Sequence, residues 1–424
     1  MAHGRRTTVE AHIIMNCTPL LALDPALPQR DLLLDETLMA EYLSRLVARH
    51  GDFGIRDCER LRTKYRIGTS LRVLYEVRGS THSYRIAARA LPRSRRVANQ
   101  LASHVEINAP ELNTIFWIFP HDRKIENLSL LTNVPNELND IEGQTWTRSR
   151  IVAHAPEKSV TAQCLNDNEQ IIAYAKIYAG DEGRQIFETY SHVAKILTTR
   201  EVQIPGAIAY FKQHKLLLLE PVAGVSLSTV TLAQHENAFF RLGNALQKLH
   251  AVNPPASLPR SKRLTPEALT QATTTISQAR PDVADLVQRL SAKLSAQYEH
   301  GKSVFLHGDV HPKNILLNDE QLVLLDLDQA ATGPAEVDLG SVSAGLYCDA
   351  CTGSRTWREV ATFIRALLTG YGKSQNTLRW HIAAALLQER ALRSVTRVRT
   401  ATLQKLPELL HTAEAVLNGG ISEN

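Results

Sequence analysis

Cysteine is scarce in this chain, which has five cysteines among 424 residues. An odd and widely spaced set of this kind does not form the disulfide framework of a secreted protein. We therefore expect buried thiols and a reducing, cytoplasmic location. Cys348 and Cys351 form a lone C-x-x-C without a second pair or nearby histidines, so zinc or redox chemistry is the weaker interpretation.

Long apolar runs and concentrated charge are also missing. No apolar run approaches the roughly 18 residues of a membrane span. The basic start of the chain, Arg5 and Arg6, is followed by Glu10 and His12, which makes a poor secretory signal. The net charge is only +5, and the basic residues are scattered along the chain. We expect neither a membrane partner nor a nucleic-acid partner.

What the chain does contain suits a globular protein with sizeable cores, at 44% hydrophobic and 21% charged residues. Apolar residues at spacings of three and four predict a helix over 31–50. Alternating patterns predict three strands over 64–91 and three more over 150–178. Only the second set runs directly into a predicted helix, 181–197, with Asp181 as its N-cap.

The two sets of strands can be read as a degenerate internal repeat. Aligned in this way, the sequence AARAL lies over YAKIY, and Arg89 falls opposite Lys176. The similarity is faint, and a coincidence between two hairpins of similar pattern explains it equally well.

The second half of the chain reads mainly as helix. A strand over 215–224 precedes a helix over 236–252, and the Pro-, Ser- and Thr-rich stretch 253–283 reads as surface loop with a short helix. A short β insertion is expected at 315–327, and the chain beyond residue 350 reads as helical. There, one apolar stripe is formed by Trp357, Val360, Ile364 and Leu367, and a second helix covers 380–395.

This order predicts a two-lobed α+β fold, with a β-rich lobe before a mainly helical lobe and an additional α/β module at the N-terminus. The expected boundaries are 1–148 for the N-terminal, cap-like module, 149–222 for the β-rich lobe and 223–424 for the helical lobe.

A polar motif interrupts the apolar runs of residues 305–330. His307-Gly308-Asp309 is followed by Asn314 after five residues, the spacing that protein kinases use in the loop H-R-D-x-x-x-x-N. There the Asp reaches the substrate hydroxyl, and the Asn reaches a Mg²⁺ on the nucleotide phosphates. Asp326 ends the next apolar run, where a carboxylate can also coordinate Mg²⁺. The metal would make these partly buried carboxylates tolerable.

With these residues the chain resembles the superfamily of aminoglycoside phosphotransferases and choline kinases, small-molecule kinases with a protein-kinase-like fold. The resemblance is carried by HGDVHPKNIL (307–316), LLDLDQA (324–330) and GPAEVDLGS (333–341). It implies a bilobal protein-kinase-like fold and ATP or GTP with Mg²⁺ as cofactors.

The resemblance also implies roles for single residues. Asp309 would be the catalytic base, Asn314 and Asp326 the Mg²⁺ ligands, and Lys176 the residue that binds the α- and β-phosphates. The segment LEPVAG (219–224) would be the hinge that meets adenine, through Glu220 and Val222. Supporting roles would fall to His307, His311, Asp328 and Asp338.

The comparison with protein kinases leaves one pairing open and shows three departures. The phosphate-binding lysine of that fold pairs with a helix glutamate, and here Glu188 and Glu182 both remain candidates. No G-x-G-x-x-G occurs, so the loop over the phosphates must be built from a segment such as HAPEKSV (154–160). The Arg of H-R-D is replaced by Gly308, and the Phe of D-F-G by Leu327. These differences disfavour a protein kinase.

The acceptor is the least determined part of the prediction. Arg390, Arg393 and Arg397 recur at helical spacing, and such a stripe is usually a solvated face. If the stripe faces the cleft, it would repel a polycationic aminoglycoside and suit a neutral or anionic acceptor. The additional module resembles the layout of maltokinases, which favours the hydroxyl of a sugar or sugar-like small molecule. The alternatives are aminoglycoside inactivation, or a catalytically silent nucleotide-binding module with a regulatory role.

Overall fold

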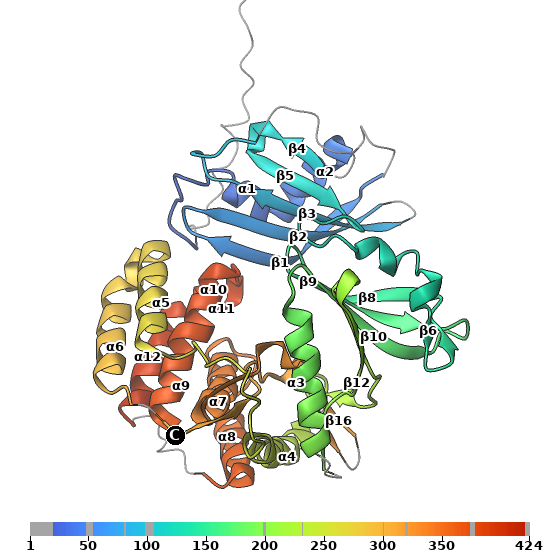
Figure 1. Ribbon diagram of the computed structural model, residues 1–424. Coiled ribbons are helices and arrows are strands. Elements are labelled where there is room, and N and C mark those ends of the chain that lie inside the picture. Colours follow the sequence, from blue (N-terminus) through green and yellow to red (C-terminus); the bar gives the residue numbers. More distant parts are fainter. Residues whose placement is uncertain are drawn as a thin grey trace, which may run out of the picture.

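The protein was examined as a computed structural model, which describes residues 20–47, 54–79, 82–97, 106–197, 201–230, 232–299, 301–318, 321–373 and 378–419. Cys17 and the basic N-terminal residues lie outside them. Three parts of the chain surround a common centre (Figure 1). They are an N-terminal module, which we define as the described residues between 20 and 118, a second sheet with its flanking helix, and a helical lobe.

The N-terminal module is a five-stranded antiparallel sheet with helices on one face. Its strand order is β1-β2-β3-β5-β4. The predicted helix over 31–50 is divided at Asp35, whose side chain accepts a hydrogen bond from the Leu38 amide at 2.9 Å. The elements are α1 (Arg30–Leu34), α2 (Glu36–Val47), β1 (Asp57–Arg66), β2 (Ser70–Arg78), β3 (Ser83–Ala90), β4 (Glu106–Ala109) and β5 (Thr114–Ile118).

The second sheet repeats this topology, with the order β8-β9-β10-β13-β12. Its strands are β8 (Arg148–Ala155), β9 (Ser159–Leu165), β10 (Ile171–Tyr178), β12 (Ala207–Phe211) and β13 (Leu216–Leu219). In both sheets the third strand pairs with the fifth, and the fourth strand forms the edge.

Local details repeat as well. Arg89 on β3 faces Ile115, the second residue of β5, and Lys176 on β10 faces Leu217, the second residue of β13. In each sheet a one-turn 3-10 helix before the fifth strand ends in a left-handed residue, Asn113 or Lys215. The alignment of Arg89 with Lys176 therefore holds in three dimensions.

The two faces of the second sheet have different partners. Because side chains alternate along a strand, Ala173, Ala175 and Ile177 point to one face and Lys176 and Tyr178 to the other. The first face packs under residues 119–147, which include β6 (Asp140–Ile141), β7 (Gln144–Thr145) and the buried Trp146. The second face carries α3 (Glu182–Ile196), as predicted, although the Asp181 side chain makes no capping hydrogen bond.

The helical lobe forms the largest core. Its helices are α4 (Leu232–His250), α5 (Pro266–Ala279), α6 (Ala284–Ala296), α7 (Glu336–Cys351), α8 (Trp357–Tyr371), α9 (Arg379–Ala385), α10 (Leu392–Thr396), α11 (Thr400–Gln404) and α12 (Leu406–Leu417). A four-stranded sheet contains β11 (Val202–Gln203), β14 (Val225–Ser226), β16 (Ile315–Leu317) and β17 (Leu322–Leu324), and β15 (Ser303–Leu306) pairs with β18 (Ala331–Pro334).

Two expectations for this lobe are wrong. The stretch 253–283 holds a full helix, α5, whose N-cap Thr265 accepts a hydrogen bond from the Ala268 amide at 3.3 Å. In the stripe on α8, Val360, Ile364 and Leu367 are buried, but the Trp357 side chain is 42% exposed. The helix expected over 380–395 contains a π-helical turn, Leu386–Ala391, between α9 and α10. Such turns shift the faces of a helix and recur at functional sites.

The structure confirms the predicted α+β fold, with a β-rich lobe, a mainly helical lobe and an additional N-terminal module. Among the described cysteines, Cys58, Cys164 and Cys351 are buried thiols, whereas Cys348 is half-buried. None of the helices in the described part of the chain is long and apolar enough to cross a membrane.

Candidate active site

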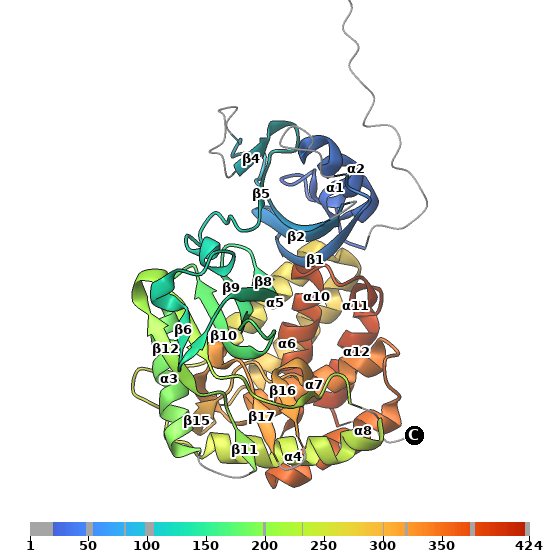
Figure 2. The same cartoon turned by 90° about the vertical axis from the view of Figure 1, so that its right-hand side faces the viewer.

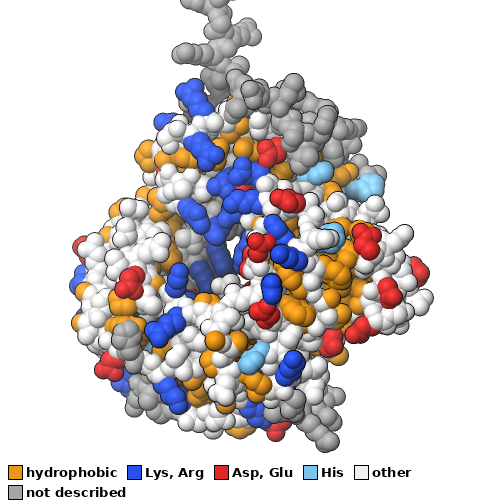
Figure 3. Space-filling view, viewed as in Figure 1, with side chains coloured by type: hydrophobic (Ala, Val, Ile, Leu, Met, Phe, Trp, Pro, Cys, Tyr) orange, Lys and Arg blue, Asp and Glu red, His pale blue; other side chains and the backbone are white. Residues whose placement is uncertain are grey.

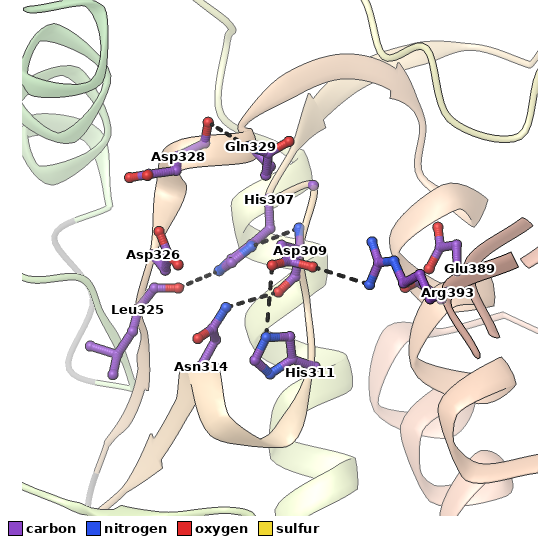
Figure 4. Close-up of polar contacts among 12 residues, drawn as sticks. His307, Asp309, His311, Asn314, Leu325, Asp326, Asp328, Gln329, Glu389 and Arg393 are labelled. Carbon is purple, nitrogen blue, oxygen red and sulfur yellow. Dashed lines mark hydrogen bonds and ion pairs between the residues drawn. The ribbon is translucent and has the colours of Figure 1, made fainter. Parts of the chain in front are cut away.

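The β16–β17 hairpin brings Asn314 and Asp326 together. Ile315 pairs with Leu324, and the Leu325 amide donates to the Asn314 carbonyl at 2.8 Å, so the residues flanking the hairpin lie side by side. The Asn314 side-chain nitrogen donates to the Asp309 carbonyl at 3.1 Å. Asp309, Asn314 and Asp326 therefore sit on one hydrogen-bonded support (Figure 4).

Buried His307 and Asp338 shape the loop under Asp309. His307 Nε2 donates to the Leu325 carbonyl at 2.9 Å, and Nδ1 accepts from the Asp309 amide at 3.3 Å, which fixes a neutral tautomer. The Asp338 carboxylate accepts from the His307 and Gly308 amides at 2.8 and 3.0 Å and from His250 at 3.2 Å. Burial alone would raise the pKa of Asp338, but the bond from His250 and nearby positive charge lower it.

Gly308 is required by the loop conformation. Its φ is +81°, and a Cβ atom here would lie 1.9 Å from the Gln329 carbonyl oxygen. A side chain such as the arginine of protein kinases has no room at this position. The Gly308 carbonyl instead accepts a hydrogen bond from Arg263, whose guanidinium also pairs with Glu389 in the π-helical turn.

The side chains of His311 and Arg393 approach the Asp309 carboxylate, and burial lowers the pKa of His311. His311 Nε2 lies 3.7 Å from Oδ2, and Arg393 Nη1 lies 3.8 Å from Oδ1. Arg393 comes from α10 and approaches from the side opposite Asp326 (Figure 4). The expectation that the arginine stripe is only a solvated face is therefore wrong for Arg393.

Lys176 bridges two carboxylates at the end of the hairpin. Its Nζ lies 2.9 Å from Asp326 Oδ1 and 2.8 Å from Asp328 Oδ2. Burial would lower the pKa of Lys176, but these two charges raise it. Burial likewise favours a higher pKa for Asp326, yet the ammonium group lowers it to about 2. Burial and the charge of Asp326 together raise the pKa of Asp328.

The expected lysine–glutamate pair is absent from the described residues. Glu188 is exposed and pairs with Arg184 at 3.1 Å, and Glu182 is exposed as well. On the inner face α3 instead presents Tyr190, whose hydroxyl accepts from the Leu327 amide at 3.1 Å. Asp328 thus takes the place of the helix glutamate as a second acidic partner of Lys176. The third residue of D-L-D supplies this carboxylate, whereas the glycine of D-F-G has no side chain to do so.

The loop expected over the phosphates, 154–160, is the tip of the β8–β9 hairpin. Its residue Glu157 has a φ of +59° and a side chain that is 1% exposed. Three arginines pair with this carboxylate: Arg123 at 2.9 Å, Arg72 at 3.0 Å, and Arg89. Arg72 and Arg89 belong to the N-terminal module, which therefore holds the tip in place. Sequence reasoning missed Glu157, because nothing near it in the chain indicates its partners.

The expected hinge connects the second sheet to the helical lobe. The Glu220 amide donates to the Gly206 carbonyl at 2.9 Å, and residues 220–224 follow without regular structure. Val222 is half-buried and Glu220 is exposed. The backbone groups of both residues therefore lie between the second sheet and the helical lobe, where a hinge is expected.

The residues present fit a metal ion that arrives with phosphate groups. Asp326 is ionised at neutral pH, and the Asn314 amide nitrogen is engaged, which leaves its oxygen as a hard ligand atom. No group of three or more His, Cys, Asp and Glu side chains in the described ranges could hold a metal alone. Mg²⁺ commonly has only one or two protein ligands and completes its shell with phosphate oxygens and water.

Comparison with known proteins now decides the family. A sequence model described as the phosphotransferase enzyme family (APH) matches residues 174–409, more than half of the chain. The chain belongs to this family. Its description as a phosphotransferase enzyme family agrees with the phosphoryl-transfer chemistry that the motifs predicted. The matched region contains Lys176 and the whole 305–330 motif, and it leaves out the N-terminal module. No curated protein matches the phosphotransferase.

Solved structures resemble parts of the phosphotransferase at low identity. A choline/ethanolamine kinase family protein from Mesorhizobium loti is 14% identical over 68% of this chain and 92% of that chain, with a TM-score of 0.47. A choline kinase from Cryptosporidium parvum is 12% identical over 71% and 98%, also at 0.47. The ADP-bound aminoglycoside phosphotransferase APH(2'')-Ib is 12% identical over 64% and 94%, at 0.44. At these values the likeness carries no argument about substrate.

Proposed function

We propose that this phosphotransferase moves the γ-phosphoryl group of ATP or GTP, with Mg²⁺, to a hydroxyl of a small molecule. The observation that carries the proposal is the single support shared by Asp309, Asn314 and Asp326, with Lys176 at its edge. Phosphoryl transfer depends on positioning and on stabilisation of charge, and a rigid loop and hairpin supply both.

The proposed roles follow from this geometry. Asp309 would accept the hydroxyl proton or orient the hydroxyl group. Asn314 and Asp326 would hold Mg²⁺, which supplies positive charge to the phosphates when bound. Lys176 would exchange a carboxylate for phosphate oxygens. The Glu220 carbonyl and the Val222 backbone would meet the base, because the Glu220 amide is already bonded to Gly206.

A sugar or sugar-like hydroxyl is the acceptor class that we propose, and the reducing cytoplasm is the proposed location. Aminoglycoside inactivation by the same chemistry is the alternative, and Arg393 beside Asp309 disfavours it, because a polycation would be repelled there. A silent regulatory module has no need of the proposed base.

The test is a coupled ADP-release screen of the purified protein against sugars, amino alcohols and aminoglycosides. In Asp309→Ala we expect turnover to fall by about 10²- to 10⁴-fold, with Mg-nucleotide binding nearly intact. Asp285→Ala, an exposed position on α6, is the matched control and should retain turnover. Loss of nucleotide binding in Asp309→Ala, with no turnover in the parent protein, would contradict the enzymatic proposal.

A further inference from the structure

Strand β1 presents a row of cations on one face. Along it Thr63 and Tyr65 are buried in the N-terminal module, whereas Arg62, Lys64 and Arg66 are exposed on the other face. This is the alternation of a half-buried strand. A cavity extends from these side chains to the tip of the β8–β9 hairpin. The basic residues that line it are Arg62, Lys64, Arg72 and Lys158.

Helix α10 of the helical lobe packs beside β1 (Figure 2). Its Arg393 contacts Asp309, and Arg397 is exposed one turn further on. The charge of Arg62 interacts with the charges of Asp309, Asp326 and Arg397. The N-terminal module and the helical lobe therefore face the same region around Asp309. Lysine and arginine side chains gather around the central hollow (Figure 3).

Asp309 and Asp326 are the carboxylates that act on Arg62, and Arg393 already contacts Asp309, so little negative charge remains for the other cations. Within the described residues, no carboxylate forms an ion pair with Arg62, Lys64 or Arg397, and Glu157 and Glu389 are occupied by other arginines. Burial and adjacent cations lower the pKa of Lys64 to about 8, and burial with neighbouring arginines lowers that of Arg397 to about 10. Like charges held this close are stabilised by a bound anion.

We propose that the acceptor carries an anionic group, phosphate or carboxylate, held by Arg62, Arg393 and Arg397 while its hydroxyl faces Asp309. This inference rests on the proposed function and narrows its substrate class. Bidentate guanidinium contacts suit both anions. The N-terminal module would then supply part of the acceptor site, through Arg62.

The position of Arg393 assigns the anion to the acceptor and not to the nucleotide. Asp326 and Lys176 mark the proposed triphosphate side of Asp309, and Arg393 approaches from the other side (Figure 4). An anion there stands next to the attacking hydroxyl. Lys64, Arg72 and Lys158, nearer the hairpin tip, are left out of the assignment because they could also face the triphosphate.

The experiment compares matched compounds with the full-length enzyme and Mg-ATP. Glucose, glucosamine, glucuronate and glucose 6-phosphate are tested at millimolar concentration as acceptors and as inhibitors of ADP release. We expect the two anions to act at lower concentration than glucose, and glucosamine to be the weakest. Equal or stronger action of the neutral or cationic compound overturns the inference, and so does inactivity of both anions. Absence of ADP release and of nucleotide binding under all conditions would instead overturn the proposed function.

Charge reversal then locates the site. Arg397→Glu and Arg62→Glu should raise the KM or inhibition constant of the anions by about 10- to 100-fold, the effect of one charge-assisted contact. The KM for ATP should change far less. Arg358→Glu, exposed on α8, and Arg95→Glu, exposed in the N-terminal module, are controls that should change neither constant. If Arg397→Glu does not fold, the same constants are measured in Arg397→Gln, which removes the charge without reversing it. A rise confined to the KM for ATP assigns these arginines to the triphosphate and overturns the inference.

Discussion

At the scale of single residues, the site is assembled from charges that neutralise one another before any ligand binds. Lys176 stands between Asp326 and Asp328 and makes two adjacent carboxylates tolerable. The same ammonium group is the one proposed to hold phosphate. Nucleotide binding would therefore have to replace its contacts, with the metal ion taking over the neutralisation of Asp326.

Lys176→Met should destabilise the ligand-free protein in a pH-dependent way. The pKa of Asp326 is depressed, so its contribution to stability is present at neutral pH and is lost as the pH falls through the folded value of about 2. Without Lys176 we expect a loss of about 1–3 kcal/mol at pH 7, less than for a fully buried pair because Asp326 is 39% exposed. The loss should shrink below pH 4, where the carboxylates become protonated.

Chemical unfolding at several pH values measures this effect. Lys195→Met, exposed on the same sheet's helix α3, is the control and should change stability by less than about 0.5 kcal/mol. Adding Asp328→Asn should restore much of the stability lost in Lys176→Met. A loss that is independent of pH would contradict the electrostatic explanation.

Gly308→Ala should destabilise the protein by at least about 3 kcal/mol, because a backbone clash with Gln329 adds to the strain of a positive φ. Gly353 is a matched control: its φ is +76°, but its Cβ position is open. Gly353→Ala should cost only about 1–2 kcal/mol. Equal losses in the two variants would show that the contact with Gln329 is unimportant.

At the scale of elements, the β8–β9 hairpin is controlled from outside its own sheet. Glu157 at its tip is buried among three arginines, whereas Glu169, in the next turn, has a similar φ of +61° but is half exposed beside Arg148 and Arg150. Comparing substitutions at the two glutamates therefore separates the effect of burial on stability from the effect of turn conformation.

Glu157→Gln should destabilise the protein by about 3–5 kcal/mol, because three partly exposed arginines lose the buried carboxylate that neutralises them. Glu169→Gln should cost no more than about 1 kcal/mol, as is usual for exposed pairs. Thermal or urea unfolding measures both. Since the hairpin is the proposed cover of the phosphates, Glu157→Gln should also raise the KM for nucleotide. Similar unfolding free energies for the two variants would argue against the buried cluster.

The sequence predicted the elements that have strong periodicity, and it missed those whose signal is local or short. The two sets of alternating strands and α3 were found. The length of α5 was underestimated, since only a short helix was expected in 253–283, because threonine is a weak helix former. In the structure Thr270 and Thr273 donate hydrogen bonds to carbonyls of the preceding turn. Strands β4 and β5 have only four and five residues, too few for a pattern to emerge.

The candidate site divides in the same way. Asp309, Asn314 and Asp326 lie in one continuous motif, so their proximity followed from spacing. Arg393 and Glu157 could not be placed, because their partners are distant in the chain and meet them only through packing. Arg393 and Asp309 are 84 residues apart, and the arginine partners of Glu157 are 34, 68 and 85 residues away. The partner of Lys176 was left open between Glu188 and Glu182, and the structure shows both side chains exposed on α3.

At the scale of the whole molecule, Arg72 and Arg89 join the N-terminal module to the second sheet through their ion pairs with Glu157. Hydrogen exchange should show this directly. The Glu157 amide donates to Asp122 at 2.9 Å and lies under the N-terminal module, so it should exchange slowly. In the double variant Arg72→Ala, Arg89→Ala we expect the amides of the hairpin tip to lose protection, since the carboxylate is released from two partners.

Amides of the turn at 166–170 provide the internal reference, because that turn is exposed and has no contact with these arginines. Their exchange should be the same in both proteins. Unchanged protection of the hairpin tip in the double variant would mean that β8 and β9 hold it without help from the N-terminal module.

The two sheets share a topology, but the equivalent position on their third strands has a different role in each. On β10 that position holds Lys176, whose partner Asp326 is 39% exposed and which is proposed to exchange carboxylate for phosphate. On β3 it holds Arg89, whose counter-ion is Glu157, a side chain that is 1% exposed and belongs to the tip of the neighbouring sheet's hairpin. The arginine is therefore neutralised by a buried group whether or not a ligand is bound, so this copy of the position joins the two sheets, whereas the other copy is the one proposed for chemistry.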